Sequence, residues 1–293
     1  MATAHVRGGA QDSSADRDRL IAATPMTEHR LVLAGIPTAV LVGGEGRPIV
    51  LLHGPGEFAL TWMRAMPELS KTHRIVAPDL PGHGASEVGV GPLDERRVLA
   101  WLDELIEQTC PTPPYVPGHL VGGAIAARFA LEGGNRVRGL ALVDTLGLRR
   151  LRPSPAFSVT LVNFLARPTP GSRDRFFRQC FVDLPSLEDQ LGPLWDPLMA
   201  MALRGAGSRG QKAAVRSLMS RFGLRALPEA DLARIPVPTT LIWGRHDRQT
   251  SLTVAQRASA RFGWPLHVIE GAADDPAFEQ PAAVVEVLAA VAA

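Results

Sequence analysis

The stretch Pro114–Ala130, PYVPGHLVGGAIAARFA, indicates the fold of the chain more clearly than any other. A short apolar run ends at Pro117, and Gly118 and Gly122 follow close behind it. Small residues that favour a helix then continue to the end of the stretch. The pattern predicts a strand, a turn too tight for side chains at its flanks, and a helix. Between the two glycines stands Leu120, whose side chain has no nucleophilic atom.

Strand-like and helix-like segments alternate on both sides of this stretch. Several of the strands are apolar throughout, as in a sheet that is covered on both faces. The alternation predicts an α/β protein with a doubly wound, mainly parallel sheet. The predicted strands are His29–Leu33, Thr38–Val42, Pro48–Leu52, His73–Ala77, Val137–Val143, Val237–Trp243 and Leu266–Ile269, and the predicted helices include Phe58–Leu69, Asp94–Cys110, Leu252–Phe262 and a closing helix from Pro281.

The alternation is interrupted from Gly147 to about Leu227, where prolines separate short helical segments and no strand-like run occurs. We expect an inserted helical cap here. Residues 1–25 are polar and rich in Asp and Arg, so we expect a disordered tail rather than a secretion signal or a membrane span. The expected organisation is the tail (1–25), a first part of the α/β core (26–146), the cap (147–230) and a second part of the core (231–293).

The composition is that of an ordinary globular protein. Of the 293 residues, 46% are hydrophobic and 20% are charged, and 31 basic against 29 acidic residues leave a formal charge of +2. This balance argues against a nucleic-acid partner. Cys110 and Cys180 have no metal-binding or redox spacing, so we expect no disulfide framework, no metal site and a cytoplasmic location.

Four stretches, taken together and in this order, resemble the α/β-hydrolase fold family, in its capped lipase, esterase and C–C hydrolase form. They are LLHGPGE (Leu51–Glu57), APDLPGHGAS (Ala77–Ser86), the turn around Leu120, and LIWGRHD (Leu241–Asp247) followed by IEGAADDPAFEQP (Ile269–Pro281). The resemblance implies a Ser-Asp-His triad at the carboxyl edge of the sheet, with the serine on a strained strand-to-helix turn.

The residues at the implied catalytic positions depart from that triad. Leu120 stands in place of the serine and Asp274 in place of the histidine, while Asp247 keeps the position of the acid. In the family, the residue at Pro55 donates a backbone N–H to the oxyanion hole, but proline has none. Val121 keeps an N–H that could serve this purpose. We therefore expect that the chain is not an ordinary serine hydrolase.

Two interpretations of the aspartate pair remain open. Asp247 and Asp274 would place two carboxyl groups at one site, which raises one pKa and suits proton transfer. Alternatively, Asp274 and Asp275 cap the helix near Pro276 and pair with Arg245 or Arg248, which is the interpretation that we favour. Leu120 is expected either to relax the turn or to form an apolar pocket floor, and His119 to point away from the pocket.

Three functions are compatible with these residues. The first is a degenerate hydrolase or binder that holds a small apolar molecule in a capped pocket. The second is a lyase, isomerase or cyclase that uses Asp247 and Asp274, and the third is a hydrolase with an unrecognised nucleophile. We expect no cofactor, no nucleic acid and no membrane partner. The expected pocket residues are Pro55, Gly56, Leu120, Val121, Phe164 and Trp195.

Overall fold

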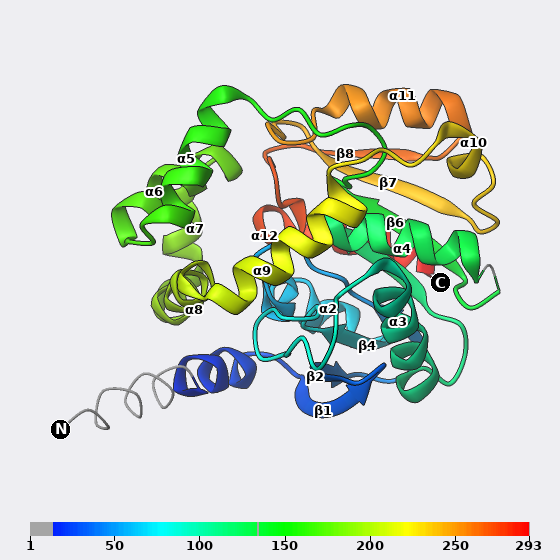
Figure 1. Ribbon diagram of the computed structural model, residues 1–293, viewed down its shortest axis with the longest axis horizontal. Helices are drawn as coiled ribbons and strands as arrows, with labels where there is room; N and C mark the ends of the chain where they lie inside the picture. The colour runs from blue at the N-terminus through cyan, green and yellow to red at the C-terminus, as the bar shows by residue number, and fades with distance from the viewer. Residues whose placement is uncertain (1–13, 134, 293) are drawn as a thin grey trace.

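An eight-stranded sheet forms the centre of the computed structural model, which describes residues 14–133 and 135–292 (Figure 1). The strand order is β1-β2-β4-β3-β5-β6-β7-β8; β1–β2 and β2–β4 pair antiparallel, and the remaining pairs are parallel. The predicted fold class is confirmed. The strands are β1 (Thr27–Leu33), β2 (Ile36–Gly43), β3 (Arg47–Val50), β4 (His73–Pro78), β5 (Tyr115–His119), β6 (Gly139–Val143), β7 (Thr239–Gly244) and β8 (Leu266–Ile269).

Helices cover both faces of this sheet, so that β5, β6 and β7 are buried along their whole length. Successive side chains of β6 alternate between two apolar clusters: Leu140 and Leu142 belong to one, Ala141 and Val143 to the other. The first cluster includes residues of α3 (Glu95–Thr109), α4 (Val121–Glu132) and α11 (Leu252–Phe262), and the second includes residues of η1 (Ala59–Trp62), α2 (Met66–Leu69), α12 (Pro276–Glu279) and α13 (Pro281–Ala292).

A helical insertion, residues 147–230, separates β6 from β7, and none of its described residues is in a strand. Its prolines begin helices rather than break them: Pro155, Pro170 and Pro185 each stand in a first helical turn, where the missing N–H costs nothing. The elements are α5 (Pro155–Ala166), α6 (Pro170–Cys180), α7 (Leu184–Leu191), η2 (Gly192–Leu194), α8 (Trp195–Gly207), α9 (Arg209–Leu218), η3 (Met219–Gly223) and α10 (Glu229–Leu232). In Figure 1, α5 to α8 lie beside the sheet and α9 returns toward α4.

The amino-terminal segment differs from the expected tail. Residues 1–13 lie outside the described part, but residues 14–22 form a helix. Leu20 is fully buried in the second apolar cluster, and Arg17 forms ion pairs with Glu28 and, at 2.9 Å, with Asp79. The expectation of disorder is therefore wrong for residues 14–22, because one apolar and one basic side chain attach this segment to the core.

Candidate functional site

The turn between β5 and α4 keeps the strained conformation that an active serine would need, although it carries a leucine. Leu120 has φ 46° and ψ −110°, a region that costs a side-chain-bearing residue about 1–3 kcal/mol. The turn is held in place by its surroundings. A Cβ on Gly118 would lie 2.4 Å from the nitrogen of Gly123, and one on Gly122 would lie 2.6 Å from the carbonyl oxygen of Leu52. The turn has therefore not relaxed.

The side chain of Leu120 is part of the apolar core. It is 3% exposed and belongs to the same cluster as Leu146, Leu218 and Phe222. Its backbone is held too: its N–H donates to the carbonyl oxygen of Val143 at 3.0 Å, and its own carbonyl oxygen accepts from the N–H of Leu146 at 3.2 Å. Leu120 thus fills the turn between β5 and α4 with packed hydrocarbon.

Three carboxyl groups meet next to this turn. The carboxyl group of Asp247 is close enough to those of Asp274 and Asp144 to raise the pKa of both, so the structure brings together the two aspartates that the sequence singled out and adds a third. Asp247 Oδ1 accepts from the backbone N–H groups of Gln249 (2.7 Å) and Thr250 (2.8 Å), and its Oδ2 accepts from Thr250 Oγ1. Asp247 is therefore well stabilised as an anion.

The neutral form is favoured for the outer two carboxyl groups. Burial and then the neighbouring Asp247 carboxylate raise the pKa of Asp274 well above its ordinary range, and the same two causes raise the pKa of Asp144. Among the described residues, nothing donates to the buried oxygens Asp144 Oδ2 and Asp274 Oδ1. A proton on each of these carboxyl groups supplies the missing donor. We therefore expect the negative charge of the group to lie on Asp247, which accepts three hydrogen bonds.

The favoured structural interpretation of this loop is right in one respect and wrong in another. Asp275 does cap α12, since its side chain accepts from the N–H of Phe278 at 3.1 Å. However, Arg245 pairs with Glu270, and Arg248 donates to the carbonyl oxygen of Arg178. Instead of an arginine, Asp274 has Gln249, whose Nε2 donates to Asp274 Oδ2 at 3.2 Å.

The sequence interpretation missed the importance of His119, which was expected to face away from the site. His119 is 2% exposed, its Nε2 donates to the backbone oxygen of Asp274 at 2.6 Å, and its Nδ1 lies 3.1 Å from Glu57 Oε2. Burial by itself lowers the pKa of His119, but the carboxylates of Glu57 and Asp275 outweigh it and raise the pKa to about 10. The available signal was that His119, Glu57 and Asp275 all lie in loops expected at one sheet edge.

Glu57, His119 and Asp275 are also the described residues with a geometry suited to a metal ion. One ligand atom of each lies within 4.8 Å of the others. A metal would have to bind the ring nitrogen of His119 that faces Glu57. This nitrogen carries a proton at neutral pH, because the pKa of His119 is about 10. The group therefore acts as a buried ion pair unless that proton is displaced.

Cys180, at the end of α6, lies against the same loop. The Asp274 N–H donates to the carbonyl oxygen of Cys180 at 2.9 Å, so the helical insertion contacts the loop that carries Asp274. Burial, followed by the neighbouring Asp274 and Glu57, raises the pKa of the Cys180 thiol well above its ordinary value. The thiolate that a cysteine nucleophile needs is strongly disfavoured here.

The expected pocket residues lie at several places around the turn and the insertion. Val121, Phe164 and Trp195 are buried, and Phe164 stacks on Phe176 with ring centroids 5.6 Å apart. Gly56 is half-buried, and its carbonyl oxygen accepts from Gln211 Nε2 at 3.0 Å. None of the six expected residues lines the two cavities described below.

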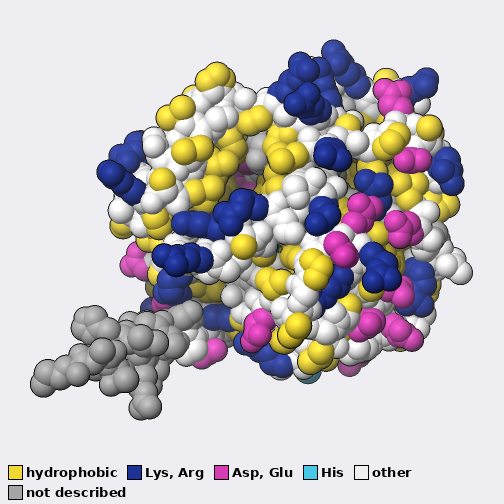
Figure 2. Space-filling model, in the orientation of Figure 1, with side chains coloured by type: hydrophobic (Ala, Val, Ile, Leu, Met, Phe, Trp, Pro, Cys, Tyr) yellow, Lys and Arg dark blue, Asp and Glu magenta, His cyan; other side chains and the backbone are white. Residues whose placement is uncertain are grey.

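The smaller cavity, of about 300 Å³, lies between the core and the helical insertion and adjoins the Gly56–Gln211 hydrogen bond. Its lining includes Phe58, Val88 and Met201. Figure 2 shows a second hollow on the same face, where hydrophobic side chains surround the gap between the insertion and the carboxyl edge of the sheet. Both hollows lie between the core and the insertion.

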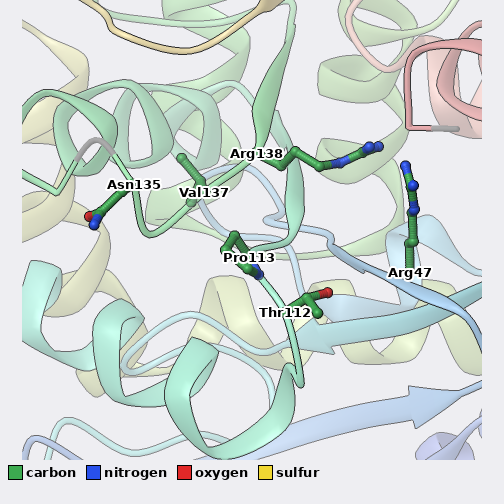
Figure 3. Close-up of a pocket in the computed structure, with 6 residues that line it drawn as sticks. All are labelled: Arg47, Thr112, Pro113, Asn135, Val137 and Arg138. Carbon is green, nitrogen blue, oxygen red and sulfur yellow. The ribbon is translucent and has the colours of Figure 1, made fainter.

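The larger cavity, of about 490 Å³, lies at the amino ends of β5 and β6, the sheet edge opposite to Leu120. Figure 3 shows its residues, with the side chains of Arg47 and Arg138 directed toward one another. Its position separates this cavity from the site.

Comparison with known proteins relates this geometry to a family. Residues 49–287 match the sequence profile of the alpha/beta hydrolase family. The chain is 32% identical over 216 residues to a pimeloyl-[acyl-carrier protein] methyl ester esterase from Nitrosomonas europaea. This alignment covers 70% of this chain and 79% of the esterase. The chain is 31% identical over 123 residues to a soluble epoxide hydrolase from Corynebacterium sp. (strain C12), covering 42% of this chain and 43% of that protein, less than half its length.

Solved structures show the same fold. Carboxylesterase CesB from Bacillus subtilis superimposes with a TM-score of 0.79 at 16% identity, over 95% of this chain and 96% of the other. In addition, no helix within residues 14–133 and 135–292 has both the length and the apolar character needed to cross a membrane.

Proposed function

The chain belongs to the alpha/beta hydrolase family, and from that premise we propose that it is a member without serine-hydrolase chemistry that binds a small apolar molecule between the core and the helical insertion. One observation carries the proposal. The position of the nucleophile is filled by Leu120, which keeps the strained turn and is 3% exposed. Acyl transfer needs an attacking oxygen or sulfur at that point, and leucine has neither.

The neighbouring groups do not replace what is lost. Asp274, which stands in place of the histidine, has a raised pKa because burial and the Asp247 carboxylate favour its neutral form, so it is a poor substitute for a histidine base. Cys180 is the nearby thiol, and its thiolate is disfavoured by the carboxyl groups around it. Pro55 has no N–H for an oxyanion. Attack, proton transfer and charge stabilisation are each impaired.

The binding part of the proposal rests on the space between core and insertion. The insertion contributes a group of phenylalanines in ring contact with one another, and the cavity of about 300 Å³ is lined by both Phe58 of the core and Met201 of α8. Ligand sites in proteins are mostly apolar with a few polar groups. Here Arg204, Ser86 and Gln211 supply such groups.

A second candidate, proton-transfer chemistry, is favoured by one specific observation. Burial and the neighbouring Asp247 carboxylate raise the pKa of Asp274, and this places a carboxyl group that favours its proton beside a carboxylate, the pairing of acid and base that enolisation or cyclisation would use. In this alternative, substrate would have to reach Asp274, which is 5% exposed, by displacing the cover formed by Cys180.

Two measurements test the proposal. The wild-type protein, incubated with 4-nitrophenyl butyrate and with a fluorophosphonate probe, should show neither turnover above background nor covalent labelling. N-phenyl-1-naphthylamine should bind with one-to-one stoichiometry, and Met201→Arg should abolish this binding while Val32→Arg, on an exposed strand position, should not. Stoichiometric labelling with turnover would refute the loss of hydrolysis, and unchanged binding to Met201→Arg would refute the placement of the ligand.

A further inference from the structure

Helix α5 (Pro155–Ala166) is apolar in sequence but is largely exposed in the fold. It contains no charged residue, and of its side chains only Phe157 and Phe164 are buried, against α6. A helix at a protein surface normally presents a polar face to water. The outward face of α5 therefore has only one exposed polar side chain, that of the uncharged Asn163.

The exposed residues of α5 lie on one face of the helix. Four apolar ones, Ala156, Val159, Val162 and Ala166, follow one another at intervals of three or four residues, the spacing of neighbours on a helix surface. The exposed Asn163 lies beside them, and Pro155 is exposed at the first position of the helix. Val159 is 59% exposed and Val162 is 63% exposed, which makes them two of the most exposed large hydrophobic residues described. Figure 2 shows hydrophobic side chains over this part of the insertion, with Lys and Arg side chains beside them. We call these four residues the α5 face.

Exposed arginines flank the α5 face at both ends of the helix. Arg149, Arg150 and Arg152 precede α5 and Arg167 follows it, and all four are exposed. From Thr145 to Ser172 the chain contains no Asp or Glu. Within residues 14–133 and 135–292, no carboxylate forms an ion pair with these four arginines.

The charge of the chain is concentrated in the same region. Residues 147–230 carry thirteen Arg and Lys against six Asp and Glu, although the whole chain has 31 against 29. The insertion thus has an excess of positive charge and the remainder an excess of negative charge. An apolar helix face between basic groups, on the positive side of a polarised molecule, complements a surface that is anionic at its boundary and apolar beneath it.

We propose that the α5 face and its flanking arginines dock the protein on an anionic lipid surface, with the valines entering the acyl boundary and the arginines contacting the headgroups. The helix lies along the surface, in agreement with the finding that no described helix is suited to span a membrane. The earlier expectation of no membrane partner is replaced by this peripheral contact. The inference is independent of the proposed function, since lipid docking needs neither the cavity nor the carboxyl groups.

The test is binding of the full chain to vesicles of phosphatidylcholine alone and of an equal mixture with phosphatidylglycerol. We expect sedimentation with the anionic vesicles only, weakened by high salt. Val159→Asp/Val162→Asp should lower this binding at least tenfold, because it puts two carboxylates into the docking face. Arg149→Gln/Arg150→Gln/Arg152→Gln should weaken it by about fivefold for each arginine removed.

Matched controls separate docking from general charge and from misfolding. The first control, Val32→Asp/Val90→Asp, changes two exposed valines outside the insertion. The second, Arg96→Gln/Arg234→Gln/Arg257→Gln, removes three exposed arginines outside the insertion. Both control variants should bind anionic vesicles as the wild type does. Thermal unfolding should be similar for all these variants, because every altered side chain is exposed. Three results would overturn the proposal: no binding to anionic vesicles, equal loss in the controls, or an α5-dependent dimer or acidic-protein complex without vesicle binding.

Discussion

His119 Nε2 donates a hydrogen bond to the backbone carbonyl oxygen of Asp274 over 2.6 Å, joining the end of β5 to the loop after β8. The same ring faces Glu57 Oε2 through Nδ1 at 3.1 Å. One buried histidine therefore connects the end of β5 with the loops that carry Glu57 and Asp274, at the carboxyl edge of the sheet. Both ring nitrogens are donors only when the imidazole is charged. The site is therefore organised around a cationic histidine next to the turn, not around a histidine at position 274.

Replacing this histidine should destabilise the fold. His119→Gln leaves Glu57 without its charged partner, and breaking a buried ion pair typically costs about 3–5 kcal/mol. Because the side chain of Glu57 is 22% exposed, we expect a loss near 2–3 kcal/mol, discounted for solvent screening. Chemical denaturation measures it. The double variant Glu57→Gln/His119→Gln should lose clearly less than the two single variants combined, and strict additivity would contradict the pairing.

The stability of the protein should decrease as the solution becomes more alkaline. The pKa of His119 is raised to about 10, so its contribution is complete below about pH 6.5 and is lost as the pH rises toward 10. The raised pKa values of Asp144 and Asp274 act in the same direction, since the folded state holds protons that the unfolded state releases. Glu57, whose pKa is lowered, acts in the opposite direction and only at acidic pH.

Measurements of the unfolding free energy between pH 7 and pH 10 test this expectation. The slope for one bound proton is up to about 1.4 kcal/mol per pH unit. His119→Gln should flatten the curve, whereas His29→Gln, at an exposed position of β1, should leave it unchanged. A wild-type curve that is flat over this range would contradict the charge assignment.

Asp274→Asn should be well tolerated, because an amide has the shape of a protonated carboxyl group and also donates a hydrogen bond. At pH 7 we expect a change in unfolding free energy of less than about 1 kcal/mol, and at pH 9 we expect the variant to be more stable than wild type. Asp247→Asn serves as the contrast. It removes the anion that accepts from Gln249, Thr250 and Asp274, and should cost about 2–3 kcal/mol. Equal effects of the two changes would refute the assignment of the single charge to Asp247.

The strain at Leu120 should be visible in a pair of substitutions. Leu120→Ala removes buried hydrocarbon and keeps the strained φ of 46°, and should cost about 2–5 kcal/mol. Leu120→Gly removes slightly more side chain but relieves the strain. A glycine variant is ordinarily less stable than the corresponding alanine variant within a helix or at its boundary. At position 120 we expect the reverse order, with Leu120→Gly at least as stable as Leu120→Ala. Thermal unfolding of the two variants decides the matter, and a less stable Gly variant would show that the turn carries no strain.

Rebuilding the triad should restore activity only in combination. Leu120→Ser alone gains an oxygen without a base, so activated-ester hydrolysis should remain near background. Leu120→Ser with Asp274→His should exceed the sum of the single changes, because triad members act as a unit. Pro55→Gly should then add about tenfold or more if its N–H reaches the oxyanion. Comparable rates for all variants would indicate a nucleophile other than residue 120.

Much of the fold could be predicted because it depends on local patterns. The apolar runs of β5, β6 and β7 can be buried only in a sheet covered on both faces. Gly118 and Gly122 allow the strand and the following helix to approach more closely than any residue with a Cβ would. The absence of a serine at 120 and of a histidine at 274 is likewise a property of the sequence itself.

Tertiary structure alone decided how the remaining groups are used. Asp144 and Asp247 are more than one hundred residues apart, as are His119 and Asp274, and no local pattern relates them; the parallel sheet brings their loops to one edge. There, burial makes a charge costly unless a partner stabilises it. The neighbouring carboxylates favour the charged form of His119, whereas burial favours the neutral forms of Asp144 and Asp274. Residues 14–22 are another example, because Arg17 pairs with Asp79 only when the folded core brings the two side chains together. Sequence thus determines which chemical groups are present, and long-range packing determines their charge.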